Sequence, residues 1–582
     1  MKDRQPAPPL TGLALYQGLW GLWRRKAYSW ALLRQDASAA LIVTLLLIPQ
    51  SLAYAALAGL PLQTGLYASI LPAIAYALLG TSGMLAVGPV AITSLLTFSA
   101  LSPLAQPGSD EYLTLAILLA SLSGVCLLAM GFLRMGFLAH FLSHPVMSAF
   151  VSSAALIIVL GQLKGLSGIA VESGTLVALL CSLFRQLDQL HWLTFGLGVG
   201  FVLLLALSRW GLVRALVSLG FKTHQASLIS KMAPVVLLVL ACVLVATLRL
   251  DQQGVAIVGA LPLNLPRLVL PDGDWGLVLT LIPAAMIISL IGFAESIAIA
   301  RTFAARRRQQ VNSNRELMGL GLANLASGLS GAFPVTGGLS RTAINQDAGA
   351  VTPLAGLLTG LGMALALVWI TGWLYYLPIA FLAAVVFVAV MSLFDWRQLP
   401  YLWRYSRGDA WTWVVTFLGV LFIGLEIGLV LGVVMSLGVW LAKNSRPHVA
   451  VVGRVPGTEH FRNFQRYQVE THPNILTLRI DESLMFANAQ EVEQRILAEV
   501  GRRPEVQHLI LMGSGINHID ASGVEMLEQL NQLMQEQGIC LHFSELKGPV
   551  LDRLQYSRLL DQMTGEVHLT QHQAMQALST SA

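Results

Sequence analysis

Charged residues are scarce in this chain of 582 residues. Asp, Glu, Lys and Arg make up 12% of the sequence, whereas hydrophobic residues make up 55%. Soluble proteins of this size carry about twice that share of charged residues. The composition therefore excludes a soluble globular protein and indicates a chain that lies mostly in a membrane.

Cysteine is also scarce, and the common catalytic motifs are missing. The sequence has four scattered cysteines, Cys126, Cys181, Cys242 and Cys540, and three of them lie in apolar segments. It therefore predicts neither a disulfide framework nor a zinc site or other metal site. No nucleotide-binding P-loop, zinc-protease motif or nucleophile elbow is present. We therefore expect a protein without a cofactor that is neither a primary pump nor an enzyme.

Long apolar runs recur from Ala39 to Ala442. Each is roughly 20 residues long, enough to cross a hydrocarbon core about 30 Å thick. We expect about fourteen spans. The first run is too long for a removed signal peptide and lacks a small-residue cleavage site.

Lys and Arg residues predict the orientation of the spans. Their clusters lie at residues 24–34, 209–231, 301–315 and 397–407. With an even number of spans between them, all face one side, which the positive-inside rule makes cytoplasmic. We expect a multi-pass protein of the cytoplasmic (inner) membrane with both termini in the cytoplasm. The net charge of +5 then reflects topology and contact with lipid headgroups, and no nucleic-acid partner is expected.

The sequence predicts four regions. A cytoplasmic N-terminal segment (1–36) precedes a transmembrane domain (37–443), a linker (444–473) and a soluble domain (474–582). A loop near residues 250–274 divides the transmembrane domain into repeats at about 37–250 and 275–443. Seven spans in each repeat, an odd number, make the second repeat run inverted relative to the first.

Two short breaks interrupt the hydrophobic pattern, at Val87–Thr93 and Thr336–Thr342. Each opens a half-length apolar helix at about the third span of its repeat. Interrupted spans at corresponding positions of two repeats point to a substrate site in a secondary transporter. A helix start aims unpaired N–H groups and a partial positive charge at its ligand, so two of them predict an anion site. The expected backbone contributors are Gly88, Val90, Ala91, Gly338 and Leu339.

Four polar side chains lie at or near these breaks. Ser340 offers a hydroxyl group, and Arg341 places a cation near mid-membrane, which costs at least about 2.5–3.5 kcal/mol and so requires a partner or a purpose. Arg341 either supplies positive potential to the anion or pairs with Glu295, and these two interpretations are compatible. Gln50 and Tyr54 lie one helical turn apart and share a face. Gln50 is expected to bind the anion, while Tyr54 either walls the pocket or packs as an ordinary aromatic residue.

The C-terminal region alternates strand and helix patterns. Strands are predicted at 475–480, 508–512 and 539–543, and helices at 489–500 and 522–537. This alternation predicts a small sheet covered by helices.

Five motifs together resemble the sulfate permease (SulP) family of anion transporters with a C-terminal STAS domain. Four lie in the membrane region, and Ile519–Gly523 resembles the core motif of STAS domains. The other four are Ile48–Ala55, Val87–Pro89, Ala294–Ala298 and Gly338–Asn345. The resemblance implies a fold of seven plus seven inverted spans, a core and a gate domain, elevator-type transport and a homodimer.

The resemblance also bears on the substrate and the coupling ion. An acidic residue at Glu295, next to Ser296, is associated in relatives with cation coupling, and we favour a proton over sodium. Sulfate is favoured because Gln50, Glu295 and the Ser340–Arg341 pair look like those of sulfate-type members. Bicarbonate or a C4-dicarboxylate as substrate, and a channel or exchanger as mechanism, remain open alternatives.

Ser522 has two interpretations. It aligns with the serine that is phosphorylated in bacterial anti-sigma-factor antagonists, which share the STAS fold. It is also placed to cap the following helix. The STAS domain is expected to serve assembly, trafficking or regulation by a cytoplasmic partner.

Overall fold

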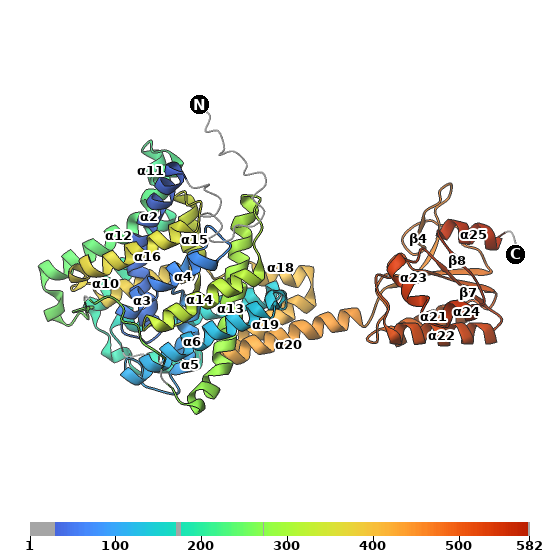
Figure 1. Ribbon diagram of the computed structural model, residues 1–582, viewed down its shortest axis with the longest axis horizontal. Coiled ribbons are helices and arrows are strands. Elements are labelled where there is room, and N and C mark those ends of the chain that lie inside the picture. The colour runs from blue at the N-terminus through green and yellow to red at the C-terminus, as the bar shows by residue number, and fades with distance from the viewer. Residues whose placement is uncertain (1–28, 170–175, 263, 272, 580–582) are drawn as a thin grey trace. The chain divides into compact units, whose positions relative to one another are not determined.

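The computed structural model describes residues 29–169, 176–262, 264–271 and 273–579. The chain divides into two compact units, Met1–Met435 and Ser436–Ala582, each with its own hydrophobic core (Figure 1). The first, called here the membrane unit, is almost entirely helical. The second, the C-terminal unit, is built around a β-sheet.

In the membrane unit the same order of elements occurs twice among the described residues. A long helix, a shorter helix, a two-residue strand, a half-length helix and four further helices follow one another. The first half contains α2 (Trp30–Leu57), α4 (Leu71–Leu79), β1 (Val87–Gly88), α5 (Ala91–Leu101), α6 (Asp110–Phe132), α7 (His144–Gly161), α10 (Trp192–Trp210) and α12 (Thr223–Leu248), with short helices α3 (Gln63–Tyr67), α8 (Leu163–Ser167), α9 (Leu176–Arg185) and α11 (Leu212–Ser218) between them.

The second half repeats this order with one short helix added. It contains α13 (Trp275–Arg306), α14 (Ser313–Leu329), β2 (Thr336–Gly337), α15 (Leu339–Asp347), α16 (Leu354–Trp369), α17 (Ile379–Met391), α18 (Gln398–Tyr405), α19 (Arg407–Phe422) and α20 (Leu425–Asn444).

Seven of the described helices are long and apolar enough to cross a membrane. They include α2, α6, α13 and α20, and five shorter apolar helices of 10–17 residues accompany them. The half-length helices α5 and α15 each begin directly after a two-residue strand, at a residue with an extended backbone. The multi-span helical fold expected from the sequence is therefore confirmed.

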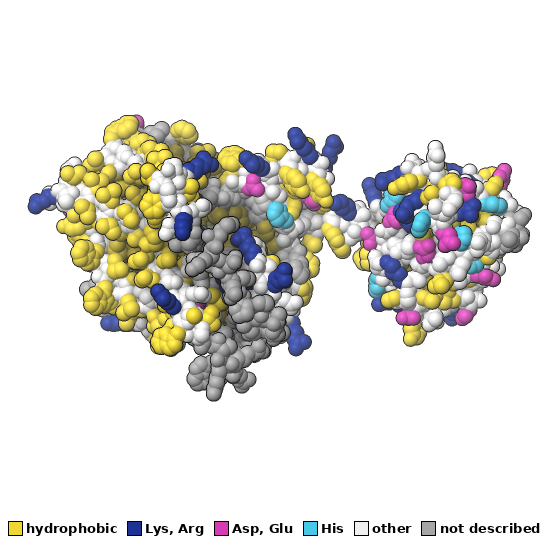
Figure 2. Space-filling model, turned by 90° about the horizontal axis from the view of Figure 1, so that it is seen from above, with side chains coloured by type: hydrophobic (Ala, Val, Ile, Leu, Met, Phe, Trp, Pro, Cys, Tyr) yellow, Lys and Arg dark blue, Asp and Glu magenta, His cyan; other side chains and the backbone are white. Residues whose placement is uncertain are grey.

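The outer helices of the membrane unit expose apolar side chains. Leu203 on α10, Val239 on α12 and Val434 on α20 are each more than half exposed. Hydrophobic side chains cover much of the visible face of this unit, whereas charged and histidine side chains are spread over the C-terminal unit (Figure 2). A surface of this kind is stable only against lipid, because a soluble protein rarely exposes so large an apolar area.

The C-terminal unit is a six-stranded sheet in the order β4-β3-β5-β6-β7-β8. β5 to β8 run parallel, and β3 is antiparallel to both its neighbours. Helices α21 (Ala489–Gly501) and α22 (Ala521–Glu536) bury leucine, isoleucine and methionine side chains against one face. Helix α25 (Gln571–Ser579) covers the other face. The strands are β3 (Val449–Arg454), β4 (Phe461–Asn463), β5 (Ile475–Ile480), β6 (His508–Met512), β7 (Cys540–Ser544) and β8 (Val567–His568).

Two segments differ from the sequence-based expectation. Residues 444–473, expected to form a linker, contain β3 and β4, and β3 pairs with β5 at the centre of the sheet. These strands were missed because the first is a short apolar run next to charged residues. Helix α2 begins at Trp30, inside the expected N-terminal segment (1–36), and its residue Asp36 is fully buried.

Candidate functional site

The two interrupted spans meet in the membrane unit. β1 and β2 form an antiparallel pair in which Val87 lies opposite Gly337 and Gly88 opposite Thr336. Because the strands are antiparallel, α5 and α15 leave the pair in opposite directions. The two breaks are far apart in the sequence but form one structural element.

Both half-helices begin without a side-chain cap. The residues at the cap positions, Val90 and Gly338, have extended backbones and make no side-chain capping bond. Their carbonyl groups accept the first helical bonds, from Ser94 N at 2.9 Å and Thr342 N at 2.9 Å. The first-turn N–H groups of both helices are therefore available to a ligand, and the helix dipoles favour an anion there.

The Arg341 side chain lies between the two helix starts. It is only 3% exposed, and its Nη1 and Nη2 atoms have no hydrogen-bond partner among the described residues. A β-carbon at Gly88 would collide with its guanidinium group, and one at Gly338 would lie 2.8 Å from Nε. The two glycines therefore leave the space that this cation occupies, and its free donors point to a missing acceptor.

Glu295, on α13, lies near this cation without contacting it. Its Oε2 atom is buried and has no hydrogen-bond partner, and no ion pair joins it to Arg341 within the described part of the chain. Tyr54 on α2 is an electrostatic neighbour of both groups. The sequence left open whether Arg341 forms an ion pair with Glu295, and this ion pair is not formed in the structure.

Helix α2 packs against both half-helices and contributes Gln50 and Tyr54. Both residues are half-buried, and Pro49 lies inside the helix just before them. The site residues that the sequence predicts on α2, α13 and α15 therefore lie in the same part of the membrane unit as the start of α5. Leu339 and Ser340 are exposed at the first turn of α15.

Ser296 has a structural task. Its hydroxyl group accepts the N–H of Gly337 at 2.9 Å and lies 2.7 Å from Thr336 Oγ1, which donates to the Gly292 carbonyl at 2.7 Å. These bonds tie β2 to α13. Glu295 and β2 are therefore held by the same helix turn.

Several residues that support the site were not singled out from the sequence. Asn324 on α14 accepts from Val335 N and donates to its carbonyl, both at 2.9 Å. Thr342 accepts from Ala86 N at 3.2 Å, and Asn345 donates to the Met84 carbonyl at 2.9 Å. The available signal was a buried amide or hydroxyl group in an apolar helix, which is costly unless it is bonded.

A buried carboxylate fixes the loop that leads into β1. Glu316, on α14, is fully buried and accepts from Tyr76 Oη at 2.7 Å, Thr81 N at 2.7 Å and Ser82 N at 3.0 Å. The Thr81 hydroxyl also bonds it. Because these partners come from α4 and the following loop, Glu316 sets where the first half-helix begins.

In the C-terminal unit, Asp520 caps α22. Its Oδ1 accepts from Gly523 N at 2.9 Å, and its Oδ2 from Phe486 N at 2.8 Å. The interpretation of Ser522 as the cap is therefore wrong. Ser522 lies in the first turn of α22 and is half-buried.

Two half-helices that start inside a multi-span domain, with a buried cation between their N-termini, define a membrane transporter. The Sulfate permease family model matches residues 33–416, and the STAS domain model matches residues 466–574. The chain belongs to the sulfate permease family of anion transporters and carries a C-terminal STAS domain. It is a multi-pass membrane transporter rather than an enzyme.

Similar sequences and structures agree with this assignment. "Probable sulfate transporter 4.2" of Arabidopsis thaliana is 35% identical over 543 residues, which cover 91% of this chain and 78% of that protein. A probable sulfate transporter of Mycobacterium tuberculosis is 34% identical over 553 residues, covering 94% and 95%. The solved structure of SLC26A9 has a TM-score of 0.87 at 23% identity, covering 96% of this chain and 92% of that one. The transmembrane domain of the cyanobacterial bicarbonate transporter BicA has a TM-score of 0.57 at 21% identity, covering 71% and 99%.

Proposed function

We propose that this protein is a secondary active transporter that moves sulfate across the cytoplasmic membrane. The observation that carries this proposal is the buried Arg341 guanidinium with two unpartnered nitrogens between two uncapped helix starts. A compact oxyanion is the ligand that such donors suit. The two helix dipoles and the cation together offset its charge.

Sulfate is preferred among the oxyanions because both described relatives at 34–35% identity are named as probable sulfate transporters. Sulfate has four acceptor oxygens for the donors of α5, α15 and Arg341. Bicarbonate or a C4-dicarboxylate is the alternative substrate. The fold is shared with a bicarbonate transporter, so the fold does not discriminate between them.

Transport is coupled to protons through Glu295 in this proposal. The carboxyl group lies near Arg341 without an ion pair to it, so an incoming anion adds its negative charge to that of the ionised carboxylate. A proton on Glu295 removes one of these charges and makes joint binding favourable. Sodium in place of the proton is the alternative.

The proposed mechanism is an elevator in which the half-helices and their support move against a gate. Hydrogen bonds tie α13 to β2 and tie α15 to the segment before β1, so the helices that carry Glu295 and Arg341 are linked to both half-helix starts, which supports their movement as one body. A channel or an exchanger is the alternative. We further propose cytoplasmic termini, a homodimer, and a cytoplasmic regulator that acts on the STAS domain, with Ser522 as a candidate modification site.

Uptake into proteoliposomes tests the function. Uptake of labelled sulfate, bicarbonate and succinate is compared with and without an inward proton gradient. The variant Arg341→Gln is compared with the control variant Arg404→Gln, which changes an exposed arginine of the basic cluster at residues 397–407. Concentrative sulfate uptake that needs the gradient and is lost only in Arg341→Gln supports the proposal. Uptake of bicarbonate or succinate alone overturns the substrate, and gradient-independent flux overturns the coupling.

A further inference from the structure

Three potential metal ligands meet on one face of the sheet in the C-terminal unit. The parallel pairing of β6 with β7 places His508 opposite Cys540. His542 follows two residues later on β7, so it projects to the same face as Cys540. One imidazole from β6 thus joins a thiol and a second imidazole from β7.

The ligand atoms are close enough to share one ion. Nδ1 of His508 lies 3.1 Å from Nε2 of His542, and one ligand atom from each of the three side chains lies within 4.8 Å of the others. In a tetrahedral zinc site, bonds of about 2.0–2.1 Å to nitrogen and 2.3 Å to sulfur place the ligand atoms about 3.3–3.6 Å apart. The spacings of the three side chains in the structure are comparable with these values.

We propose that His508, Cys540 and His542 form a Zn²⁺ site in the STAS domain. His542 is buried, whereas His508 and Cys540 are half-buried, so an ion can enter from solvent. One thiolate with two imidazoles suits zinc among the divalent metals. Three protein ligands leave the fourth position for water, which makes the site exchangeable rather than permanent.

The hydrogen bonds of His542 define what zinc must displace. Its Nδ1 accepts the backbone N–H of Glu566 at 3.0 Å, so the proton of the neutral ring is on Nε2, which donates to His508. Zinc bonding to Nε2 moves that proton to Nδ1, and the Cys540 thiol releases its proton to solvent.

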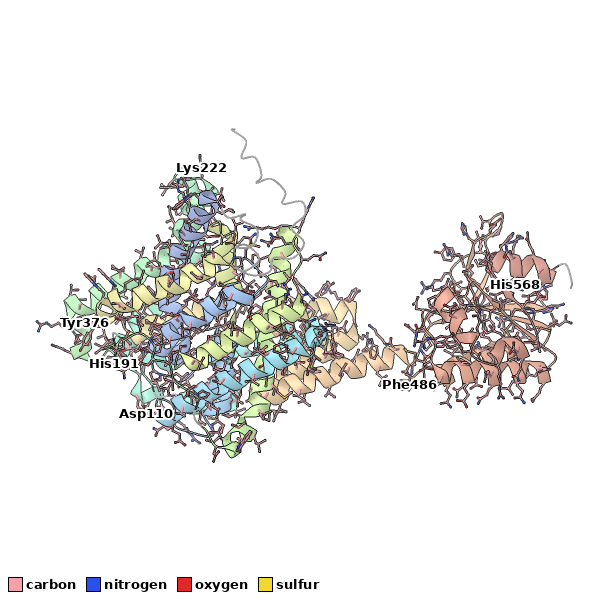
Figure 3. The ribbon with its side chains drawn as sticks, in the orientation of Figure 1. Asp110, His191, Lys222, Tyr376, Phe486 and His568 are labelled. Atoms are coloured by element: carbon pink, nitrogen blue, oxygen red, sulfur yellow. The ribbon has the colours of Figure 1, made fainter. Side chains whose placement is uncertain are left out.

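Zinc binding therefore breaks the hydrogen bond between the N–H of Glu566 and Nδ1 of His542, at the edge of the sheet. With Nδ1 protonated, the N–H of Glu566 loses its acceptor and turns to solvent. Glu566 directly precedes β8, whose His568 is stacked on His542 with ring centroids 5.9 Å apart and is labelled in Figure 3. The site thus links metal occupancy to the edge strand beside α25.

Metal binding to the full-length, untagged protein tests this proposal. After chelation, Co²⁺ is added and its thiolate charge-transfer absorption is recorded, and Zn²⁺ is then titrated by calorimetry. We expect one ion per chain and a cobalt–thiolate band. Cys540→Ser should remove the band and weaken zinc binding at least about ten-fold, whereas Cys181→Ser, which changes an exposed cysteine, should leave both unchanged.

Two further readouts use the unmodified chain, so they do not depend on a variant that folds. Zinc should protect Cys540 from alkylation but not Cys181. It should also increase hydrogen exchange at the Glu566 amide. No cobalt–thiolate band, or equal zinc binding by Cys540→Ser and the unmodified protein, overturns the proposal and leaves His508 and His542 as a hydrogen-bonded pair.

Discussion

Glu295 and Arg341 are an acidic and a basic residue of the candidate site, yet no ion pair joins them, and each has at least one buried polar atom without a partner among the described residues. A buried ion pair is normally closed, because an uncompensated charge is strongly destabilising. The open arrangement therefore costs stability in the absence of substrate. In the proposed function, this arrangement leaves the cation free to bind an anion and the carboxyl group free to bind a cation.

The space beside Arg341 depends on two glycines. Gly88→Ala or Gly338→Ala would push a methyl group into the guanidinium group, because the added carbon has no room there. We expect sulfate uptake to fall at least about ten-fold, since a change of about 1.4 kcal/mol in anion binding suffices. Gly200→Ala is the matched control, because an added carbon there meets nothing within 4 Å. Uptake that is unaffected at both glycines would contradict this assignment of the site.

The carboxyl group of Glu295 is expected to carry the coupled proton. Glu295→Gln keeps the shape but binds no proton, so sulfate uptake should no longer respond to a pH gradient, while Glu295→Asp should retain part of the response. The measurement is initial uptake at fixed internal pH and varied external pH. Gradient-driven uptake by Glu295→Gln equal to that of the unmodified protein would exclude coupling through this residue.

Glu316 is expected to stabilise the membrane unit through its bonds to Tyr76, Thr81 and Ser82. In Glu316→Gln, the amide oxygen can replace Oε1, but the N–H₂ group takes the place of the oxygen that accepts from Tyr76, and the bonds are no longer charge-assisted, at a cost of about 1.5–3 kcal/mol. We expect a lower melting temperature in detergent by intrinsic fluorescence. Glu111→Gln, on an exposed first turn of α6, should melt like the unmodified protein. Equal melting of both variants would show that the Glu316 bonds contribute little.

A surface ion pair joins Lys231 on α12 to Asp347 at the end of α15. These side chains are 25% and 50% exposed, so we expect the ion pair to stabilise the conformation that contains it by no more than about 1 kcal/mol. This free energy corresponds to about a five-fold change in the equilibrium between conformations with and without the pair. Asp347→Lys should shift sulfate affinity measured from one side by up to this factor. Adding Lys231→Asp should restore it. A double variant as impaired as the single one would show that the pair is not coupled to transport.

The half-helices could be predicted from sequence because glycine and proline leave a local signal. The breaks at residues 87–93 and 336–342 needed no knowledge of distant partners. Similarly, β5 and β6 were predicted with their observed bounds because they are short apolar runs between turn residues. Local patterns of this kind determine where an element starts.

The supporting contacts could not be predicted because they join distant parts of the chain. Glu316 binds a loop 235 residues before it. The role of Ser296 also depends on β2, which lies 40 residues further on. For the same reason the cysteine spacing predicts no zinc site, although the sheet register places His508 opposite Cys540.

The pairing of β1 with β2 has a consequence for the energetics of a full transport cycle. Because Val87 pairs with Gly337 and both half-helices start from this pair, in the proposed elevator the groups that surround the anion would keep one arrangement whichever side the site faces. The dissociation constant should then be nearly equal on the two sides of the membrane. Net direction is left to the gradients of the anion and its coupled ion, and the same protein would run in reverse when those gradients are inverted.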